Sequence, residues 1–283
     1  MQSARSVLII GCGYLGVRAG AVLRSMGWRV TGTTTRPERF DELSALGIEP
    51  ALLDLARPEE SAAWGGRHDA VVYAVAAGKG DPGLCFREGA VECARRFSRS
   101  DRFIHISTTG VHAQADGSAI DEESPAEPTE ERPRAIRDAE ERLLKLARRA
   151  EAPALILRLG GLYGPGRSPV EWLRRPVMRE RLLRGGREAY MSWVRVEDAA
   201  AAVGLAAESG RPGEVYLIVD DEPVRREDFY RFAAERAGLP PPDFPSRPGD
   251  LGKRCSNRKA RAELGFAPRF PTYREGLSGK EML

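Results

Sequence analysis

The chain has 283 residues, of which 42% are hydrophobic and 30% are charged, the balance of an ordinary globular protein and not of a disordered or fibrous one. Its 44 Lys and Arg nearly balance its 41 Asp and Glu, so the net charge of +3 gives no reason to expect nucleic acid as a partner. The longest apolar run, residues 70–77, covers eight residues, whereas a membrane span needs about 20. We therefore expect no membrane segment.

The few cysteines and histidines argue against a disulfide framework or a zinc site. None of the four Cys forms a CxxC pair, and there are only three His. The N-terminal segment lacks the apolar region of a secretory signal, which favours a reducing cytoplasm. Arginine supplies 39 of the 44 cations, so only five are lysines, a bias that we attribute mainly to genomic composition.

Short apolar runs alternate with longer amphipathic segments along the first part of the chain. Strands that are apolar on both faces and separated by helices are typical of a parallel sheet covered on both sides. We predict an α/β fold, a Rossmann-type doubly wound sheet, with strands at Val7–Ile10, Arg29–Thr33, Ala51–Leu53, Ala70–Ala76, Phe103–Ile106 and Ala154–Leu157. The run of seven acids in 116–131 is interpreted as an exposed loop.

From Tyr163 onward the composition changes, and it predicts a smaller mixed lobe. Residues 164–187 are dense in Gly, Pro and Arg, and 238–250 is rich in proline, whereas 214–219 indicates a strand and 226–237 a helix. We expect 1–162 to be the NAD(P)-binding domain, with 191–212 returning to it. Residues 163–190 and 213–283 would form the substrate lobe.

A glycine-rich turn follows the first strand. Gly11, Gly13 and Gly16 form GxGxxG, directly before a segment with helical apolar spacing. In such a turn the first glycine permits the tight bend, the second allows a pyrophosphate to approach, and the third allows the helix to pack. The backbone amides at the helix start, including Tyr14 and Leu15, would donate to the phosphates. A plain glycine turn is the alternative interpretation.

The end of the second strand predicts which dinucleotide binds. An Asp or Glu there would bind a ribose 2′-hydroxyl, but this chain has Thr34, Thr35 and Arg36. Arg36, helped by Thr34 or Arg39, could pair with a 2′-phosphate, so NADP is favoured over NAD. In so arginine-rich a chain, a solvent-facing Arg36 is the alternative.

With these residues the chain resembles the extended short-chain dehydrogenase/reductases, the NAD(P)-dependent epimerase/dehydratase superfamily. The glycine pattern is the shortened form of atypical members. The resemblance implies that Asp54 and Leu55 contact the adenine and that Ala76 lies beside the cofactor, with Ser107 in the family's Ser-Ser/Thr-x-x-Val-Tyr stretch. The other matching segments are 157–166, 194–200, 253–257 and 263–268.

The chain departs from that family in its catalytic residues. Family enzymes use Tyr followed four residues later by Lys, but none of the seven tyrosines here has Lys at that spacing. Alignment of the helix at 139–143 puts Pro133 or Arg132 at the Tyr position and Arg137 or Ile136 at the Lys position. Proline cannot titrate and arginine stays protonated. Thr109 and Gly110 replace the acids of the dehydratases, which disfavours dehydration.

Three residues remain as candidates for chemistry. Thr108 matches the hydroxyl residue that binds the substrate oxygen, although it could instead satisfy loop backbone groups. His112 stands where many members have Tyr and could donate a proton, or could be a loop residue. Tyr163 could lie near the nicotinamide, or could pack as a buried aromatic residue. One or two arginines could clamp an anionic substrate, with most solvated: Arg167, Arg174, Arg175, Arg179, Arg181, Arg184 and Arg187.

Two functions follow from these features. The first is an NADP-dependent oxidoreductase or epimerase for a small or nucleotide-linked hydroxyl or carbonyl substrate. The second is a non-catalytic NAD(P)-binding or redox-sensing module, which the missing Tyr-Lys pair favours. The sequence does not decide whether the chain forms a homodimer through the helix at 137–150. The apolar residues of this helix, Leu143, Leu144 and Leu146, can be buried by packing on the sheet alone.

Overall fold

A computed structural model describes residues 4–57, 59, 61–76, 83–175, 177–178 and 185–282. The chain divides into two compact units. The first unit is Met1–Val111, Ala126–Arg158 and Ala200–Tyr216, and the second is His112–Pro125, Leu159–Ala199 and Leu217–Leu283. No helix in the described part of the chain is both long enough and apolar enough to cross a membrane.

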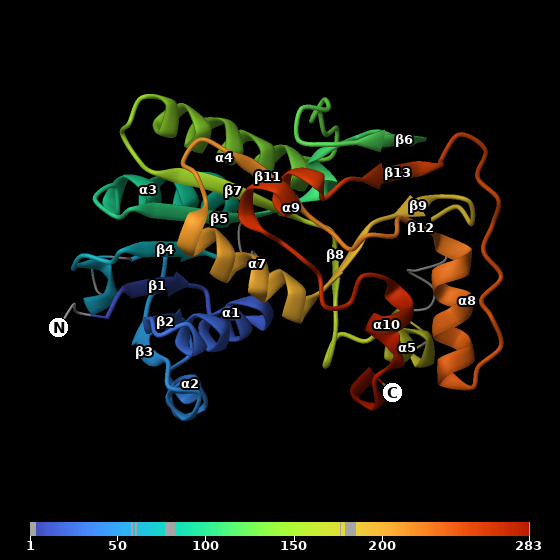
Figure 1. Ribbon diagram of the computed structural model, residues 1–283, viewed down its shortest axis with the longest axis horizontal. Coiled ribbons are helices and arrows are strands. Elements are labelled where there is room, and N and C mark those ends of the chain that lie inside the picture. The colour runs from blue at the N-terminus through green and yellow to red at the C-terminus, as the bar shows by residue number, and fades with distance from the viewer. Residues whose placement is uncertain are drawn as a thin grey trace. The chain divides into compact units, whose positions relative to one another are not determined.

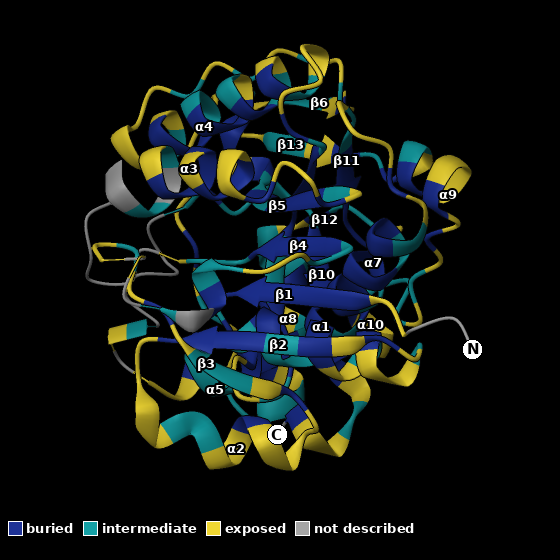
Figure 2. Ribbon diagram, turned by 90° about the vertical axis from the view of Figure 1, so that its left-hand side faces the viewer, coloured by how far each residue is buried: buried dark blue, intermediate teal, exposed yellow. Residues whose placement is uncertain are grey.

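A seven-stranded sheet with the order β11-β7-β5-β4-β1-β2-β3 organises the first unit (Figure 1). β3, β2, β1, β4 and β5 run parallel. β1 and β4 consist entirely of buried residues and are dark blue in Figure 2, as expected for strands covered on both faces. The strands are β1 (Ser6–Ile10), β2 (Arg29–Thr34), β3 (Glu49–Leu52), β4 (Ala70–Tyr73), β5 (Arg102–Thr108), β7 (Ala154–Leu159) and β11 (Val215–Ile218).

Helices cover the sheet on both faces. An apolar cluster that includes Tyr73 and Phe103 of the sheet with Val91 and Leu143 of the helices lies beneath α3 and α4. On α7, Gly204 lies so close to Val22 and Met26 that the two helices α1 and α7 must pack directly together. The helices are α1 (Tyr14–Ser25), α2 (Phe40–Ala45), α3 (Gly89–Arg96), α4 (Glu131–Arg148) and α7 (Val196–Ser209).

The strand order reverses direction between β1 and β4, since the chain moves outward from β1 to β3 and then returns to the other side of β1. In open α/β sheets, ligands bind at this switch point, outside the carboxyl ends of the strands. The glycine turn 11–16 begins directly after β1. The fold therefore places the predicted phosphate-binding turn at the edge where such sheets bind cofactors.

The second unit contains two small sheets and an aromatic core. One sheet has the order β12-β9-β13-β6 and the other pairs β10 with β8. Tyr163, Trp193 and Phe229 lie at the centre of the core. The elements are β6 (Asp116–Ile120), β8 (Gly161–Tyr163), β9 (Tyr190–Met191), β10 (Trp193–Arg195), β12 (Val224–Arg225), β13 (Gly252–Cys255), α5 (Pro169–Arg174), α8 (Arg226–Ala237), α9 (Arg258–Leu264) and α10 (Tyr273–Ser278).

The predicted fold class, a doubly wound α/β sheet with a smaller mixed sheet, is confirmed. The interpretation of 116–131 as a loop is wrong at both ends. Residues 116–120 form β6, which pairs in parallel with β13, and Glu131 begins α4. β6 carries a single buried residue, Ile120, and its partner strand lies more than 130 residues later, so no local apolar pattern could indicate it. The roles assigned to the two domains remain predictions.

Candidate cofactor-binding site

The glycine turn requires glycine at two of its three positions. Gly11 has φ +96° and donates its N–H to Thr33 Oγ1 at 3.0 Å, and an added Cβ would lie 3.0 Å from the carbonyl oxygen of Ala74. A Cβ on Gly16 would lie far closer than 3.0 Å to the carbonyl oxygen of Gly11. Gly16 therefore lets the first turn of α1 pack directly on the bend that precedes it.

Gly13 has a different role, because its conformation does not demand glycine. It is the N-cap of α1 with φ −85°, and an added Cβ would meet no atom within 4 Å. No side chain caps the helix, and its first turn contains no acid. At the N-terminus of α1, the backbone N–H groups of Tyr14 and Leu15 can therefore donate hydrogen bonds to an anion, and no carboxylate in the first turn competes with that anion. The turn fits a pyrophosphate that lies against the Gly13 backbone.

Two arginines, Arg36 and Arg39, follow β2. The guanidinium of Arg39 is held by protein partners, whereas among the described residues that of Arg36 is not. Arg39 donates from Nη1 to the carbonyl oxygen of Cys12 at 2.5 Å and forms an ion pair with Glu42 at 2.8 Å, which lowers the pKa of Glu42. Thr34 Oγ1 accepts the backbone N–H of Arg36 at 3.1 Å. The exposed side chain of Arg36 makes no hydrogen bond or ion pair within the described residues. Arg36 is thus available for a ligand beside the glycine turn.

The remaining candidate cofactor residues lie in the loops after the next strands. Asp54 follows β3, is exposed, and accepts the backbone N–H of Ala56 through Oδ1 at 3.0 Å. Leu55 is half-buried, and Ala76 is exposed after β4. The Asp54 carboxylate thus stabilises the turn in which it lies. Contacts of Asp54 and Leu55 with the adenine remain predictions. Ala77 lies outside the described residues.

Ser107 belongs to a buried ionic network that sequence reasoning did not find. Its hydroxyl donates to Glu140 Oε1 at 2.6 Å, beneath the end of β5. Arg158 of β7 binds the same carboxylate in bidentate fashion, with Nε–Oε1 of 3.0 Å and Nη2–Oε2 of 2.7 Å. Glu140 is 0% exposed and Arg158 is 2% exposed. The network therefore ties α4 to β5 and β7, and it commits the Ser107 hydroxyl to Glu140.

The three candidate catalytic residues lie in different units. Thr108 ends β5 in the first unit, and its Oγ1 accepts the N–H of Gly110 at 3.0 Å, as the loop interpretation expects. In the second unit, His112 is 1% exposed and its Nδ1 lies 3.1 Å from the carbonyl oxygen of Pro125. Tyr163 is fully buried, and burial raises its pKa far above the usual range. The burial of His112 and Tyr163 favours their packing alternatives.

Arg174, Arg175 and Arg187 each have a partner within the second unit. Arg174 donates to the carbonyl oxygen of Ala237 at 3.3 Å, and Arg175 lies 4.0 Å from Glu171. Arg187 donates to the carbonyl oxygen of Phe244 at 2.6 Å. Arg179, Arg181 and Arg184 lie outside the described residues.

Comparison with known proteins identifies the family. The model of the NAD dependent epimerase/dehydratase family matches residues 7–218. The chain belongs to this family. It is 29% identical to the Protein YeeZ of Escherichia coli over 94% of this chain and 97% of that protein. It is 27% identical to a 3-diazoavenalumate denitrifying reductase of Streptomyces sp. over 97% and 99% of the two chains.

Among solved structures, a UDP-glucose 4-epimerase of Thermotoga maritima with UDP-glucose has the same fold. The TM-score is 0.77, with 22% identity and 96% of each chain covered. The protein therefore has the same fold as an enzyme that binds a nucleotide sugar.

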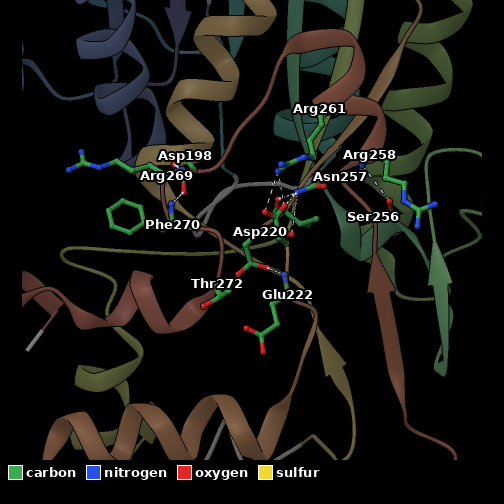
Figure 3. Close-up of polar contacts among 12 residues, drawn as sticks. Asp198, Asp220, Glu222, Ser256, Asn257, Arg258, Arg261, Arg269, Phe270 and Thr272 are labelled. Carbon is green, nitrogen blue, oxygen red and sulfur yellow. Dashed lines mark hydrogen bonds and ion pairs between the residues drawn. The ribbon is translucent and has the colours of Figure 1, made fainter.

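The second unit of this family member also holds two buried carboxylates that the sequence did not single out. Asp198 accepts the backbone N–H groups of Arg269 at 2.8 Å and Phe270 at 3.0 Å (Figure 3). Asp220 is 2% exposed, and its Oδ1 accepts the N–H of Glu222 at 3.3 Å, whereas Oδ2 has no hydrogen-bond partner in the described structure. Burial raises the pKa of Asp220 to about 8.

Replacement of Asp220 by asparagine should therefore stabilise the protein near neutral pH. Between its unfolded pKa near 4 and its folded pKa near 8, Asp220 binds more protons in the folded state, so wild-type stability falls as the pH rises. The advantage of Asp220→Asn should grow by about 2–3 kcal/mol between pH 5 and pH 7. Urea unfolding of both proteins at the two pH values measures this, and an advantage that does not change with pH would contradict it.

Proposed function

We propose that the chain is an NADP-dependent oxidoreductase or epimerase that acts on a hydroxyl or carbonyl substrate. The observation that carries the proposal is Arg36, whose guanidinium makes no hydrogen bond or ion pair within the described residues and which, with Thr35, stands directly after β2 in place of an acid. A carboxylate at that place would repel a 2′-phosphate, whereas a guanidinium can bind it in bidentate fashion. The bound nicotinamide would supply the hydride chemistry.

Different residues of the chain would bind the cofactor and position the substrate. The backbone at Gly13 and the first amides of α1 would hold the pyrophosphate, and Arg36 would hold the 2′-phosphate. Thr108, at the carboxyl end of β5, would hold the substrate oxygen. Its hydroxyl must then also serve the N–H of Gly110, which it can do because a hydroxyl accepts and donates at once.

The substrate class in this proposal is small or nucleotide-linked. Support comes from the family and from the similarity of this chain to the UDP-glucose 4-epimerase and the reductase described above. Dehydration is disfavoured, because Thr109 and Gly110 offer no general acid.

The cofactor preference is tested by Arg36→Ala. We expect this change to weaken NADPH binding at least about tenfold, or 1.4 kcal/mol, and to leave NADH binding unchanged, because only NADPH carries the 2′-phosphate. Calorimetric titration measures both. Arg29→Ala is the matched control, since Arg29 is exposed at the opposite end of the same strand. Equal losses for both cofactors after Arg36→Ala, or no loss at all, would refute the assignment.

A second candidate function is a non-catalytic NADP-binding module, for example a redox sensor. The observation that favours it is the burial of His112 and Tyr163, which leaves neither side chain exposed as a proton donor in its own unit. The absorbance of bound NADPH separates the candidates when carbonyl compounds and nucleotide sugars are added in turn. Oxidation by one of them supports the enzyme, and retention of NADPH with all of them supports the module.

A further inference from the structure

Lys253 stands out because lysine is scarce and this lysine lies on the inner face of a sheet. It is one of five lysines in a chain where arginine supplies the other 39 cations. On β13 its side chain shares a face with Cys255, which is packed in a buried cluster with Ile120, Leu217 and Val219. The next residue, Arg254, lies on the exposed face. Lys253 is therefore half-buried on the side of the strand that faces the core.

Within the described residues, the ammonium group of Lys253 has a single protein acceptor. Its Nζ donates to the carbonyl oxygen of His112 at 2.7 Å. Among the described residues it forms no ion pair with a carboxylate. Burial lowers the pKa of Lys253, and only the thiol of Cys255, not a carboxylate, opposes this effect. Two of its three N–H groups are thus left for another partner.

Among the described residues, the two fully buried cations are neutralised by carboxylates, whereas the half-buried Lys253 is not. Arg158 is paired with Glu140. Arg195, 2% exposed, forms ion pairs with Glu197 at 3.0 Å and Glu281 at 2.5 Å. Even partial burial of a charge without a counter-ion is costly, so such a charge is expected where a ligand supplies the opposite charge.

We propose that Lys253 is a substrate-binding residue of the second unit that holds an anionic oxygen of the substrate, from a phosphate or a carboxylate group. A compact ammonium on a flexible stem can direct its remaining N–H groups to one oxygen while it keeps the bond to the carbonyl of His112. The planar guanidinium of arginine, with its fixed fork, is less suited to this. That the bound anion is part of a substrate rests on the proposed function. The presence of an anion site at Lys253 does not.

Chemical labelling tests the site directly, because five lysines can be followed separately by peptide mass spectrometry. The full-length protein is acetylated with acetic anhydride in inorganic phosphate, in malonate, or in chloride at equal ionic strength. We expect phosphate, malonate or both to slow acetylation of Lys253 several-fold relative to chloride. Acetylation of the exposed Lys145 should be unchanged. Protection by only one of the two anions identifies the anionic group.

A second measurement uses variants. The anion that protects Lys253 should raise the melting temperature of the wild type and of Lys145→Met more than that of Lys253→Met. If Lys253→Met does not fold, the labelling of the wild type decides alone. Equal labelling of Lys253 in all three salts overturns the proposal. Labelling with and without NADPH separates the two proposals, because protection of Lys253 does not require that the cofactor binds.

Discussion

Gly16→Ala is expected to destabilise the first unit by about 3 kcal/mol and to abolish NADPH binding. The added Cβ would overlap the carbonyl oxygen of Gly11, which is backbone and cannot move without opening the turn. The N-terminus of α1 would then be displaced from the end of β1, and its amides would no longer converge on one anion. Urea unfolding and calorimetric titration measure the two losses.

The matched control is Gly13→Ala, at the neighbouring glycine of the same turn. Its Cβ would meet no protein atom within 4 Å, and its φ of −85° suits any residue. The protein should therefore keep its stability to within about 1 kcal/mol, the usual cost of alanine at a helix N-cap. NADPH affinity should nevertheless fall, because the methyl group would occupy the space in front of the turn. Wild-type stability and affinity in Gly16→Ala would refute this account of the turn.

The second large effect is expected for Glu140→Ala, which should lower the free energy of unfolding by about 3–5 kcal/mol. The substitution would remove the carboxylate that pairs with the buried Arg158 and with Arg137, and the acceptor of the Ser107 hydroxyl. Most of the loss comes from the stranded charge and not from the value of the ion pair itself. The free energy of unfolding in urea is the measurement.

Two further variants establish the cause of that loss. Glu141→Ala, at the next residue, removes an exposed carboxylate that only meets Arg137 at 3.1 Å, and should cost less than about 1 kcal/mol. The double variant Glu140→Leu with Arg158→Met removes both charges and should recover much of the stability. A double variant that is no more stable than Glu140→Ala would show that the stranded charge is not the cause.

The sequence allowed prediction of those features that depend on short stretches of chain. The strands at Val7–Ile10 and 154–157 were evident because they are apolar throughout and flanked by helical spacing. The glycine turn was recognisable because its three glycines and both flanks lie within about 20 residues. Tyr163 and His112 show the limit of this reasoning, since both residue types suit chemistry as well as packing, and only burial distinguishes the two.

The features that escaped prediction depend on residues far apart in the chain. Ser107, Glu140 and Arg158 are separated by 33 and 18 positions, and nothing in the sequence indicates that the three side chains meet. The partner of Lys253, the carbonyl oxygen of His112, lies 141 positions away. Backbone acceptors leave no trace in side-chain patterns, so only the fold could reveal these contacts.

Calorimetric titration of cofactor-stripped wild-type protein with NADP⁺, NADPH, NAD⁺ and NADH tests the central claim most directly. We expect the two phosphorylated forms to bind at least about tenfold more tightly than the other two, since only they engage Arg36. Binding of none of the four would contradict the assignment of the glycine turn as a dinucleotide site, and the proposed oxidoreductase would fall with it.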